Sequence, residues 1–521
     1  MDSDIARLAI IDCISNIESC RETQCDMDAI YSNLCEAITG EINRKLPKYE
    51  SRSTNKRHKT RKPYWNDTLS EQWQRLRQRE REFLKCCNNH RVKTALRREY
   101  IHARDSFDKS LRQAERAYRK EKSIEIETIS TNNPNEFWDK INKLGPRSDK
   151  SIPCEIIDEN GNVVRNENEV LEKWKLDFES LYNGTDNSEF DSEHYRRAKV
   201  HKLLLENNIN DPLYTSNVTL NGNITLTEIS DLVMKAKSRS AGGYDDIPYF
   251  VLKCPVIIAT LRELFQLMFD TGIIPSIWRK SIICPILKDP LSDPRVPLHY
   301  RGVSLLSCVS KLYTGFINKR LTRYIDEYKI LEDEQNGFRR NRSCEDHVFS
   351  LNGIIRNNTT VFTAFIDLRK CFDFIDIDML LYKLLLNGID GKIYTSIKSI
   401  YKHSTASVRL NNMLTDWFTC LTGVKQGDTA SPPLFSIFAN DLVKEVNDLD
   451  LGFELNGKKV SMLLYADDIV CIAKTEEDLQ RILDTLRDWC RRWRVLINTE
   501  KSSCSLPPRP RCMHRLFIQD W

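Results

Sequence analysis

The chain has 521 residues, which is long enough for two or more domains with a large apolar core. No apolar run reaches the roughly 18 residues that a membrane span needs, and the first residues lack the basic and apolar stretches of a signal peptide, so we expect no membrane partner. The 17 cysteines are scattered without a Cys-x-x-Cys pair, which argues against a zinc site and indicates a reducing compartment, the nucleus or the cytoplasm.

The formal net charge of +4 is unevenly distributed along the chain. Residues 51–150 hold 26 Lys and Arg against 14 Asp and Glu, a local net charge of +12. A basic segment beside an acidic remainder suggests a polyanionic partner for that segment. A solvated helix face is the plain alternative, and charge alone does not decide between them. The basic cluster at 56–62 is compatible with a nuclear localisation signal, although such clusters are common by chance.

The first 150 residues divide into an N-terminal segment and a basic helical region. Residues 1–60 predict a short helix and a basic linker. In residues 61–150, apolar side chains recur every three or four positions, which predicts two long helices that pack as a hairpin and are interrupted at 86–90. Residues 132–146 predict a turn, a short amphipathic helix and a Gly-Pro stop. The apolar stripe comprises Trp73, Leu76, Phe83, Leu96, Tyr100, Ala103, Phe107, Leu111, Ala114 and Tyr118.

The rest of the chain predicts a larger domain with an extension before it. Residues 151–250 are polar and mixed, and we assign them to this extension; a Gly-containing loop follows a helix at 235–248. From 251 to 505, helical stretches alternate with short apolar runs, which predicts a compact α/β or α+β domain. Residues 506–521 form an atypical tail.

Three aspartates follow or interrupt apolar runs in this larger domain. The run that begins at Phe362 predicts a buried strand with Asp367 at its C-terminal end. Residues 461–473, SMLLYADDIVCIA, predict a tight hairpin with Asp467 and Asp468 at its tip. A buried carboxylate is costly unless it is paired or binds a metal. If the two strands are neighbours, the acids converge and suit Mg²⁺, a hard ion that prefers oxygen ligands. The alternative is that the two adjacent acids are an ordinary turn pair.

Sequence blocks around these aspartates point to a known family. Residues 465–468, Tyr-Ala-Asp-Asp, resemble the Y-x-D-D motif of reverse transcriptases. Residues 62–83 are similar to the linker that joins endonuclease and polymerase in LINE-type proteins. The resemblance covers roughly residues 60–505. Five further blocks resemble motifs of the non-LTR retrotransposon branch, in chain order: 299–325 and 335–351 in the fingers, 365–376 and 423–442 in the palm, and 493–502 with its late lysine.

The resemblance implies both a fold and a reaction. The implied fold is an α+β right-hand polymerase, with fingers and a split βαβ (ferredoxin-like) palm at 251–505, preceded by a basic α-helical extension. The implied reaction is RNA-directed DNA synthesis by two-metal nucleotidyl transfer from a dNTP to a primer 3′-hydroxyl. The implied partners are an RNA template, a DNA primer, dNTPs and the element's own RNA; the implied cofactor is Mg²⁺, with Mn²⁺ as the alternative ion.

The resemblance also assigns catalytic roles. Asp367, Asp467 and Asp468 become the catalytic carboxylates and metal ligands, with Asp468 the weaker one, and the backbone carbonyl of Ile366 or Leu368 assists. Lys501 matches the family's late lysine, which protonates the leaving pyrophosphate as a general acid.

The implied nucleotide-binding residues are Phe372, Arg301, Arg339, Gln426 and Gly427. An aromatic ring at Phe372 leaves no room for a ribose 2′-hydroxyl and so favours deoxynucleotides; the alternative is a core phenylalanine at a helix start. For Gln426 and Gly427, in a glycine-containing loop, the alternative is simple turn chemistry. For Arg301 and Arg339 it is surface charge. Weaker assignments are Gly423 in the same loop, Arg342 and Lys288 for phosphate binding, and Asp373, whose family role is less certain.

The chain also departs from the family pattern. Asp428 and Ala430 are unusual after Gln-Gly, and an extra acid beside the nucleotide is expected to weaken catalysis. Arg-Gly-Val at 301–303 replaces Arg-Pro-Ile. No endonuclease precedes the linker and the tail does not resemble a thumb, so the resemblance implies a truncated product that does not nick its own target by that route and grips template and primer weakly. Two rivals stay open: a catalytically weak or inactive RNA-binding remnant, and a host-adopted structural or interaction protein that acts through its basic helices.

Overall fold

The computed structural model describes residues 12, 14–17, 23–45, 62–86, 90–130, 152–158, 161–184, 187–209, 214–238, 242–289, 291–455 and 457–505. The chain divides into two compact units: Met1–Pro47 together with Ile152–Trp521, and Lys48–Ser151. The turn and helix expected at 132–146, the basic cluster at 56–62 apart from its last lysine, and the tail at 506–521 lie outside the described residues.

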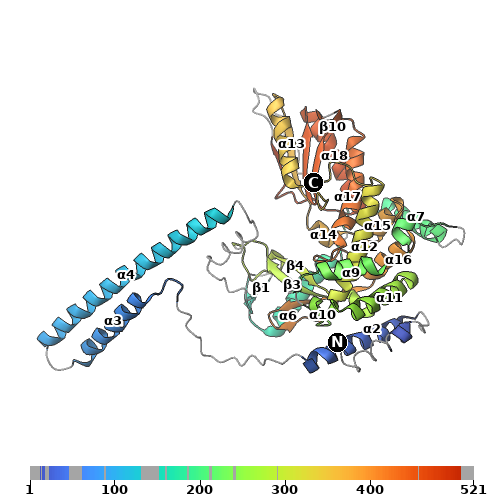
Figure 1. Ribbon diagram of the computed structural model, residues 1–521. Coiled ribbons are helices and arrows are strands. Elements are labelled where there is room, and N and C mark those ends of the chain that lie inside the picture. Colours follow the sequence, from blue (N-terminus) through green and yellow to red (C-terminus); the bar gives the residue numbers. More distant parts are fainter. Residues whose placement is uncertain are drawn as a thin grey trace. The chain divides into compact units, whose positions relative to one another are not determined.

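The smaller unit is a helical hairpin (Figure 1). It consists of α3 (Asp67–Lys85) and α4 (His90–Ser130), the two helices expected from the apolar stripe. Phe107 of α4 is buried against α3, with its ring 5.3 Å from that of Trp73. Nearer the turn, the rings of Phe83 and Tyr100 stack at 6.1 Å. The apolar side chains therefore face the seam between the helices, which leaves most of the basic side chains exposed to solvent.

The larger unit is a mixture of helices and sheets, as the alternation of helical and apolar runs predicts. No helix among the described residues is long and apolar enough to cross a membrane. Its helices are α2 (Gln24–Lys45), α6 (Glu167–Tyr182), α7 (Ser192–Ile209), α8 (Val218–Asn221), α9 (Leu226–Lys235), α10 (Tyr249–Leu252), α11 (Pro255–Thr271), α12 (Cys308–Glu327), α13 (Cys344–Asn357), α14 (Cys371–Phe374), α15 (Ile377–Leu386), α16 (Gly391–Tyr401), α17 (Ser431–Asn447) and α18 (Glu476–Trp493), with short 3-10 turns η1 (Ser276–Arg279) and η2 (Pro297–His299).

The strands form two main sheets and two short ribbons. One main sheet has the order β11-β12-β5-β13; the other has the order β4-β3-β6-β7, with β8 also paired to β6. The ribbons are β1-β2 and β10-β9. The strand bounds are β1 (Ile156–Ile157), β2 (Val163–Val164), β3 (Lys280–Leu287), β4 (Tyr300–Leu305), β5 (Phe362–Asp367), β6 (Ser404–Leu410), β7 (Met413–Leu414), β8 (Phe418–Cys420), β9 (Phe453–Leu455), β10 (Lys458–Val460), β11 (Met462–Tyr465), β12 (Asp468–Ala473) and β13 (Ser503–Ser505).

The sheet that contains β5 is packed on both faces. One face contributes Ala364 and Ile366 to the main core, together with helices α17 and α18. The other face packs against α13 through Leu463, Ile472 and Ile354; in Figure 1, α13 and α18 lie on opposite sides of these strands. The register of the sheet is specified because a slip by one residue would exchange the side chains that pack into the main core with those that pack against α13.

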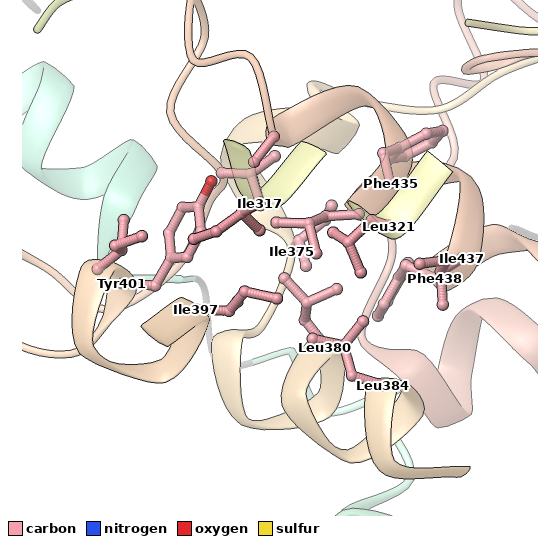
Figure 2. Close-up of a cluster of buried hydrophobic side chains, with 14 of the residues drawn as sticks. Ile317, Leu321, Ile375, Leu380, Leu384, Ile397, Tyr401, Phe435, Ile437 and Phe438 are labelled. Atoms are coloured by element: carbon pink, nitrogen blue, oxygen red, sulfur yellow. The ribbon is translucent and has the colours of Figure 1, made fainter. Parts of the chain in front are cut away.

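The main core extends from this sheet into the helices around α12 and α15. Figure 2 shows buried side chains of this region, in which Ile317 and Leu321 of α12 belong to the same apolar cluster as Leu380 and Leu384 of α15. Each of these four side chains is at most 1% exposed. This packing holds the loop between β5 and α15, which carries several of the residues discussed below.

One buried cation lies within the helical core. The Nζ of Lys383 donates to the Phe438 carbonyl at 2.6 Å and to Asp441 at 2.7 Å. The same amine lies 3.7 Å from the ring centre of Trp493 and 4.6 Å from that of Trp489. Burial lowers the pKa of Lys383 to about 8, although Asp441 opposes the shift. Lys383 therefore connects α15, α17 and α18.

Helix α2 belongs to the larger unit, which its sequence did not indicate. Tyr31 is buried and donates to Asp245 at 2.6 Å. Asp28 accepts from the backbone N–H of Ser276 at 2.6 Å and from its hydroxyl at 2.8 Å. Helix α2 thus docks on residues that follow the helical hairpin in the chain.

Candidate active site

The three aspartates singled out from the sequence lie at the end of one sheet. β5 ends at Asp367, β12 begins at Asp468, and these two residues are direct cross-strand partners. Tyr465 pairs with Asp468 across the hairpin, so Ala466 and Asp467 form its tip. Ala466 has a φ of 60°, a left-handed conformation that costs free energy for a residue other than glycine and is often kept at functional sites. The convergence expected of the three acids is therefore present.

The electrostatics of this group suit a cation. Partial desolvation raises the pKa of Asp468, and repulsion from the Asp467 and Asp367 carboxylates raises it further. A bound divalent ion would relieve this repulsion, and carboxylate oxygens are the ligands that Mg²⁺ prefers. No group of three or more His, Cys, Asp or Glu side chains within the described ranges is arranged to hold a metal ion. The donor set still fits Mg²⁺, because that ion is usually bound by one or two carboxylates and completes its coordination with waters and substrate phosphates.

A cleft of about 650 Å³ opens beside the carboxylates and gathers most of the expected nucleotide-binding residues. Two of the aspartates, Asp367 and Asp467, line it directly. Lys501 and Phe372 line it as well, and the Phe372 ring stacks on Phe435 at 4.8 Å. The other expected residues in its wall are Lys288, Arg301, Asp373, Gln426 and Gly427.

Two of the expected arginines are placed elsewhere. Arg339 is not among the residues that line the cleft; its guanidinium donates to the carbonyls of Glu332 at 2.7 Å and Gln335 at 3.1 Å. Arg342 pairs with Asp333 at 3.0 Å. Both side chains therefore stabilise the loop before α13, and we leave them out of the proposed nucleotide site.

The loop that contains Gln426 is fixed by its glycines. Gly423 has a φ of 90°, and a Cβ there would lie 2.7 Å from the carbonyl oxygen of Asp373, so a side chain does not fit. Gly427 has a φ of 105°. The side-chain amide of Gln426 donates to the Asp373 carboxylate at 2.9 Å. The backbone carbonyl of Gln426 accepts from the backbone N–H of Ser304 on β4 at 2.7 Å. Through these two hydrogen bonds the loop bridges β4 and α14.

Several supporting residues were not predicted. Asn498 donates to the Asp367 carboxylate at 2.7 Å. Gln335 is fully buried, and its amide oxygen accepts from the N–H groups of Gly337 at 3.0 Å and Ala466 at 3.3 Å. A Cβ at Gly337 would lie 2.2 Å from the nitrogen of Ala466. Both segments lie in the quoted motif blocks, but a role for these side chains becomes visible only once the strands are neighbours.

Asp373 is a buried acid in the wall of the cleft. Its side chain is 8% exposed, and it accepts from Tyr182 at 3.5 Å as well as from Gln426. Burial raises the pKa of Asp373 to about 6, although the nearby Lys370 and Lys288 oppose this. Burial also lowers the pKa of Lys370 to about 8, with repulsion from Lys288 in the same direction. The cleft therefore holds groups that titrate near neutral pH.

We expect Asp373→Asn to stabilise the protein at pH 7. The pKa of Asp373 is raised from 3.8 to about 6 on folding, so its stabilising contribution is present below about pH 4 and is lost as the pH rises through about 6. The neutral amide of asparagine avoids the buried negative charge. We therefore expect the free energy of unfolding to rise by on the order of 1 kcal/mol at pH 7, and this gain to disappear near pH 4. Urea unfolding at both pH values measures the difference; a gain that does not change with pH would contradict it.

The unusual acid of the glycine-containing loop is withdrawn from solvent. Asp428 is 5% exposed and lies close to Thr314 and Lys425. Burial raises the pKa of its carboxyl. Asp428 also lines the catalytic cleft, so the expectation that this acid weakens catalysis stays a prediction.

Comparisons with known proteins agree with the motifs. The family described as "Reverse transcriptase (RNA-dependent DNA polymerase)" matches residues 288–514. The chain is 29% identical over 291 residues to the probable RNA-directed DNA polymerase from transposon BS of Drosophila melanogaster. The aligned residues cover 54% of this chain and 32% of that protein. It is 27% identical over 296 residues to the polymerase from mobile element jockey of the same species, with 53% and 31% covered.

A third relative, with a lower identity to this chain, also comes from a mobile element. The Pol polyprotein from the type-1 retrotransposable element R2 of Nasonia vitripennis is 24% identical over 230 residues, which covers 43% of this chain and 22% of that protein. The chain spans about a third of the length of the first two curated relatives. Residues 288–514 are therefore a reverse transcriptase domain, of the kind found in the RNA-directed DNA polymerases of non-LTR retrotransposons.

Proposed function

We propose that this chain catalyses RNA-directed DNA synthesis, adding deoxynucleotides to a primer 3′-hydroxyl on an RNA template. The observation that carries this proposal is the pairing of Asp367 with Asp468 across two strands, with Asp467 beside them at the hairpin tip. Acids that repel one another at the wall of a nucleotide-sized cleft are what a metal-dependent nucleotidyl transfer requires.

In this mechanism, Asp367, Asp467 and Asp468 would hold Mg²⁺, or Mn²⁺ as the alternative. When bound, the ion would activate the primer hydroxyl and stabilise the negative charge that develops on the leaving pyrophosphate. Asn498 fixes the Asp367 carboxylate by its hydrogen bond. Lys501, which also lines the cleft, gives a proton to the pyrophosphate oxygen as the bond to the α-phosphorus breaks.

The triphosphate is held by the positive charges of the cleft. Arg301 is exposed on β4, and Lys288 follows β3. Partial burial lowers the pKa of Lys288, and repulsion from Lys501 and Arg301 adds to this, whereas Asp373 opposes it. A polyphosphate would relieve the repulsion among these cations.

The chain topology supports a palm for this site. The elements β5, α17, β11, β12, α18 and β13 occur along the chain in a βαββαβ order, with helices and strands of other parts inserted between β5 and α17 and the ribbon β9-β10 inserted before β11. Their sheet order, β11-β12-β5-β13, is that of a ferredoxin-like fold, in which the fourth strand pairs with the first. We assign the second main sheet, which carries Arg301, to the fingers.

Phe372 is proposed to select deoxynucleotides. Its ring is held between Phe435 at 4.8 Å and Phe338 at 6.1 Å, so it cannot easily move aside. We expect Phe372→Val to raise the ratio of ribonucleotide to deoxynucleotide incorporation by about one to two orders of magnitude, because the smaller side chain leaves room for a 2′-hydroxyl. Single-nucleotide extension with dTTP and with UTP measures the ratio, and Phe362→Val on β5 provides a matched control away from the cleft. An unchanged ratio would assign Phe372 to the core alone.

The decisive experiment uses purified protein with poly(rA)/oligo(dT), Mg²⁺ and dTTP. Incorporation of dTMP that depends on the metal supports the proposal. Salt-dependent RNA binding without incorporation would favour an RNA-binding remnant. Binding of neither RNA nor template–primer would favour a structural or interaction protein.

The helical hairpin is proposed to contact the template or element RNA. Arg98, Lys109, Arg112, Arg116 and Lys120 are exposed, and on a helical projection they lie on the side of α4 opposite the buried Phe107. Several other arginines are neutralised by neighbours, such as Arg119 by Glu115 at 2.8 Å. A row of basic side chains on one helix face suits a phosphate backbone.

A further inference from the structure

A second concave surface lies outside the catalytic cleft. A cavity of about 670 Å³ has in its wall Tyr195 and Lys199 of α7, together with Phe374, Asp376, Ile377, Asp378, Tyr401, Lys402, His403 and Arg494. A neighbouring cavity of about 400 Å³ is lined by the C-terminal part of α7, by α16 and by Arg279. Lys402 and His403 line both cavities. We call the two together the α7–α16 groove.

The groove is long enough for more than one nucleotide. Its residues on α7 run from Tyr195 to Ile209. Fourteen residues of helix rise about 21 Å. A free mononucleotide would occupy one of the two cavities, whereas a strand would follow both. None of the catalytic carboxylates lines either cavity.

Positive charge exceeds negative charge along the groove. Asp378 is shared by three lysines: Lys199 at 3.3 Å, Lys402 at 3.9 Å, and Lys202, which donates to it directly. The carboxylate of Asp378 neutralises at most one of these cations. Burial lowers the pKa of Lys402, and repulsion from Lys202 lowers it further, so an additional anion there would be stabilised.

The other acids of the groove already have partners. Glu206 pairs with Lys398 at 2.9 Å and accepts from the Tyr394 hydroxyl. Asp376 accepts from the Tyr195 hydroxyl at 3.0 Å. These two acids therefore already use part of their hydrogen-bonding capacity. The excess of cationic over acidic side chains in the wall favours an anionic ligand.

Aromatic rings accompany the cations in the larger cavity. The Arg494 guanidinium lies 4.6 Å from the ring centre of Tyr195 and 5.4 Å from that of Phe190. The Lys199 amine lies 4.4 Å from the Tyr195 ring. Flat rings and guanidinium planes beside a positively charged groove are the elements with which proteins bind single strands, by stacking of bases and pairing of phosphates.

We propose that the α7–α16 groove binds a single strand of nucleic acid, as a second contact distinct from the catalytic cleft. Phosphates follow Lys402, Lys398 and Arg279, and a base enters the larger cavity beside Tyr195 and Arg494. The inference rests on the proposed polymerase function for its choice of ligand, because a template has a single-stranded part that extends beyond the primer. Its geometry is independent of the catalytic aspartates.

The test combines two charge-neutralising substitutions. Lys402→Gln removes the shared cation, and Arg494→Asn removes the guanidinium while the left-handed backbone at this position, φ 60°, suits asparagine. Lys444→Gln, at an exposed lysine of α17 that lines neither cavity, is the matched control. Binding of a 5′-labelled 20-residue oligo(rA), and of the same DNA sequence, is followed by fluorescence anisotropy over a salt series.

We expect the double variant to bind the RNA and the DNA oligonucleotide about tenfold more weakly than the wild type does. The slope of log affinity against log salt concentration should fall by about one to two, while the control matches the wild type. A loss for one sugar type alone identifies which strand uses the groove. Unchanged binding in a double variant whose urea midpoint equals that of the wild type would overturn the proposal.

Photo-crosslinking to the unaltered protein gives a second readout that does not depend on folding of a variant. With oligonucleotides that carry 4-thiouridine, crosslinks should map to peptides of 190–209 or 391–403 and should be competed by unlabelled oligo(rA). Competition by dTTP but not by oligo(rA) would assign the groove to a free nucleotide and contradict the proposal.

The same samples separate the two hypotheses. If the wild type incorporates dTMP but the groove variant binds strands normally, only the groove assignment fails. If the wild type does not incorporate nucleotides but the groove variant loses strand binding, only the polymerase proposal fails.

Discussion

Asp467→Asn is expected to reduce dTMP incorporation by about three orders of magnitude. The amide has almost the same shape as the carboxylate, so the hairpin tip between Tyr465 and Asp468 should keep its backbone. In the proposed mechanism the substitution removes one negative oxygen ligand, and with it part of the charge that would hold the divalent ion near the primer hydroxyl. Steady-state extension of oligo(dT) on poly(rA) at saturating dTTP measures the effect.

A control at another acid of the chain makes this result specific. Asp450 has a side chain that is 80% exposed and pairs with Lys459 at 2.6 Å. Its φ of 54° also suits asparagine. Asp450→Asn should therefore leave incorporation within about twofold of the wild type. Retention of more than a tenth of the activity by Asp467→Asn would remove this carboxylate from the proposed metal site.

The second large effect concerns stability and lies at Lys383. We expect Lys383→Ala to lower the free energy of unfolding by about 3–5 kcal/mol. The substitution removes the hydrogen bonds to Phe438 and Asp441 and leaves a void between the rings of Trp489 and Trp493. Urea unfolding measures the loss.

Two comparisons show whether this loss comes from the buried position. Lys383→Met fills the volume without the charge and should cost less than Lys383→Ala, because the cavity is largely avoided. Lys392→Ala breaks an ion pair with Asp270 in which both side chains are partly exposed, and should cost less than about 1 kcal/mol. Equal losses at Lys383 and Lys392 would show that the aromatic surroundings of Lys383 contribute little.

The positions of the three aspartates could be predicted because each depends on a short local pattern. An apolar run that ends in Asp367 is enough to indicate a strand end, and the Tyr-Ala-Asp-Asp hairpin places two more acids at a tip. That the two strands would be neighbours came from the resemblance, and the cross-strand pair Asp468 and Asp367 confirms it. The apolar stripe of α3 and α4 was predictable for the same reason, since its period is visible within one helix.

The residues that support these acids could not be predicted, because their contacts join distant segments. Asn498 meets Asp367 across 131 residues, and Gln335 meets Ala466 across the same separation. Arg339 was expected at the nucleotide because it is a basic residue in a motif block, yet its guanidinium binds backbone carbonyls of its own loop. Charge in a motif thus indicated a residue type but not the direction in which the side chain points.

The docking of α2 has a consequence for synthesis of the protein. The first partner of Tyr31, Asp245, follows it by 214 residues, and the second, Ser307, follows Tyr31 by 276 residues. At 5–20 residues per second, a ribosome needs roughly 10 to 40 seconds to translate the shorter interval. During that time the apolar side of α2, which includes Met27, Ile30 and Leu34, has no surface to cover it and is open to chaperones or to premature association. The nascent chain therefore passes through a vulnerable period, because the hairpin unit and the following part of the larger unit are translated before Asp245.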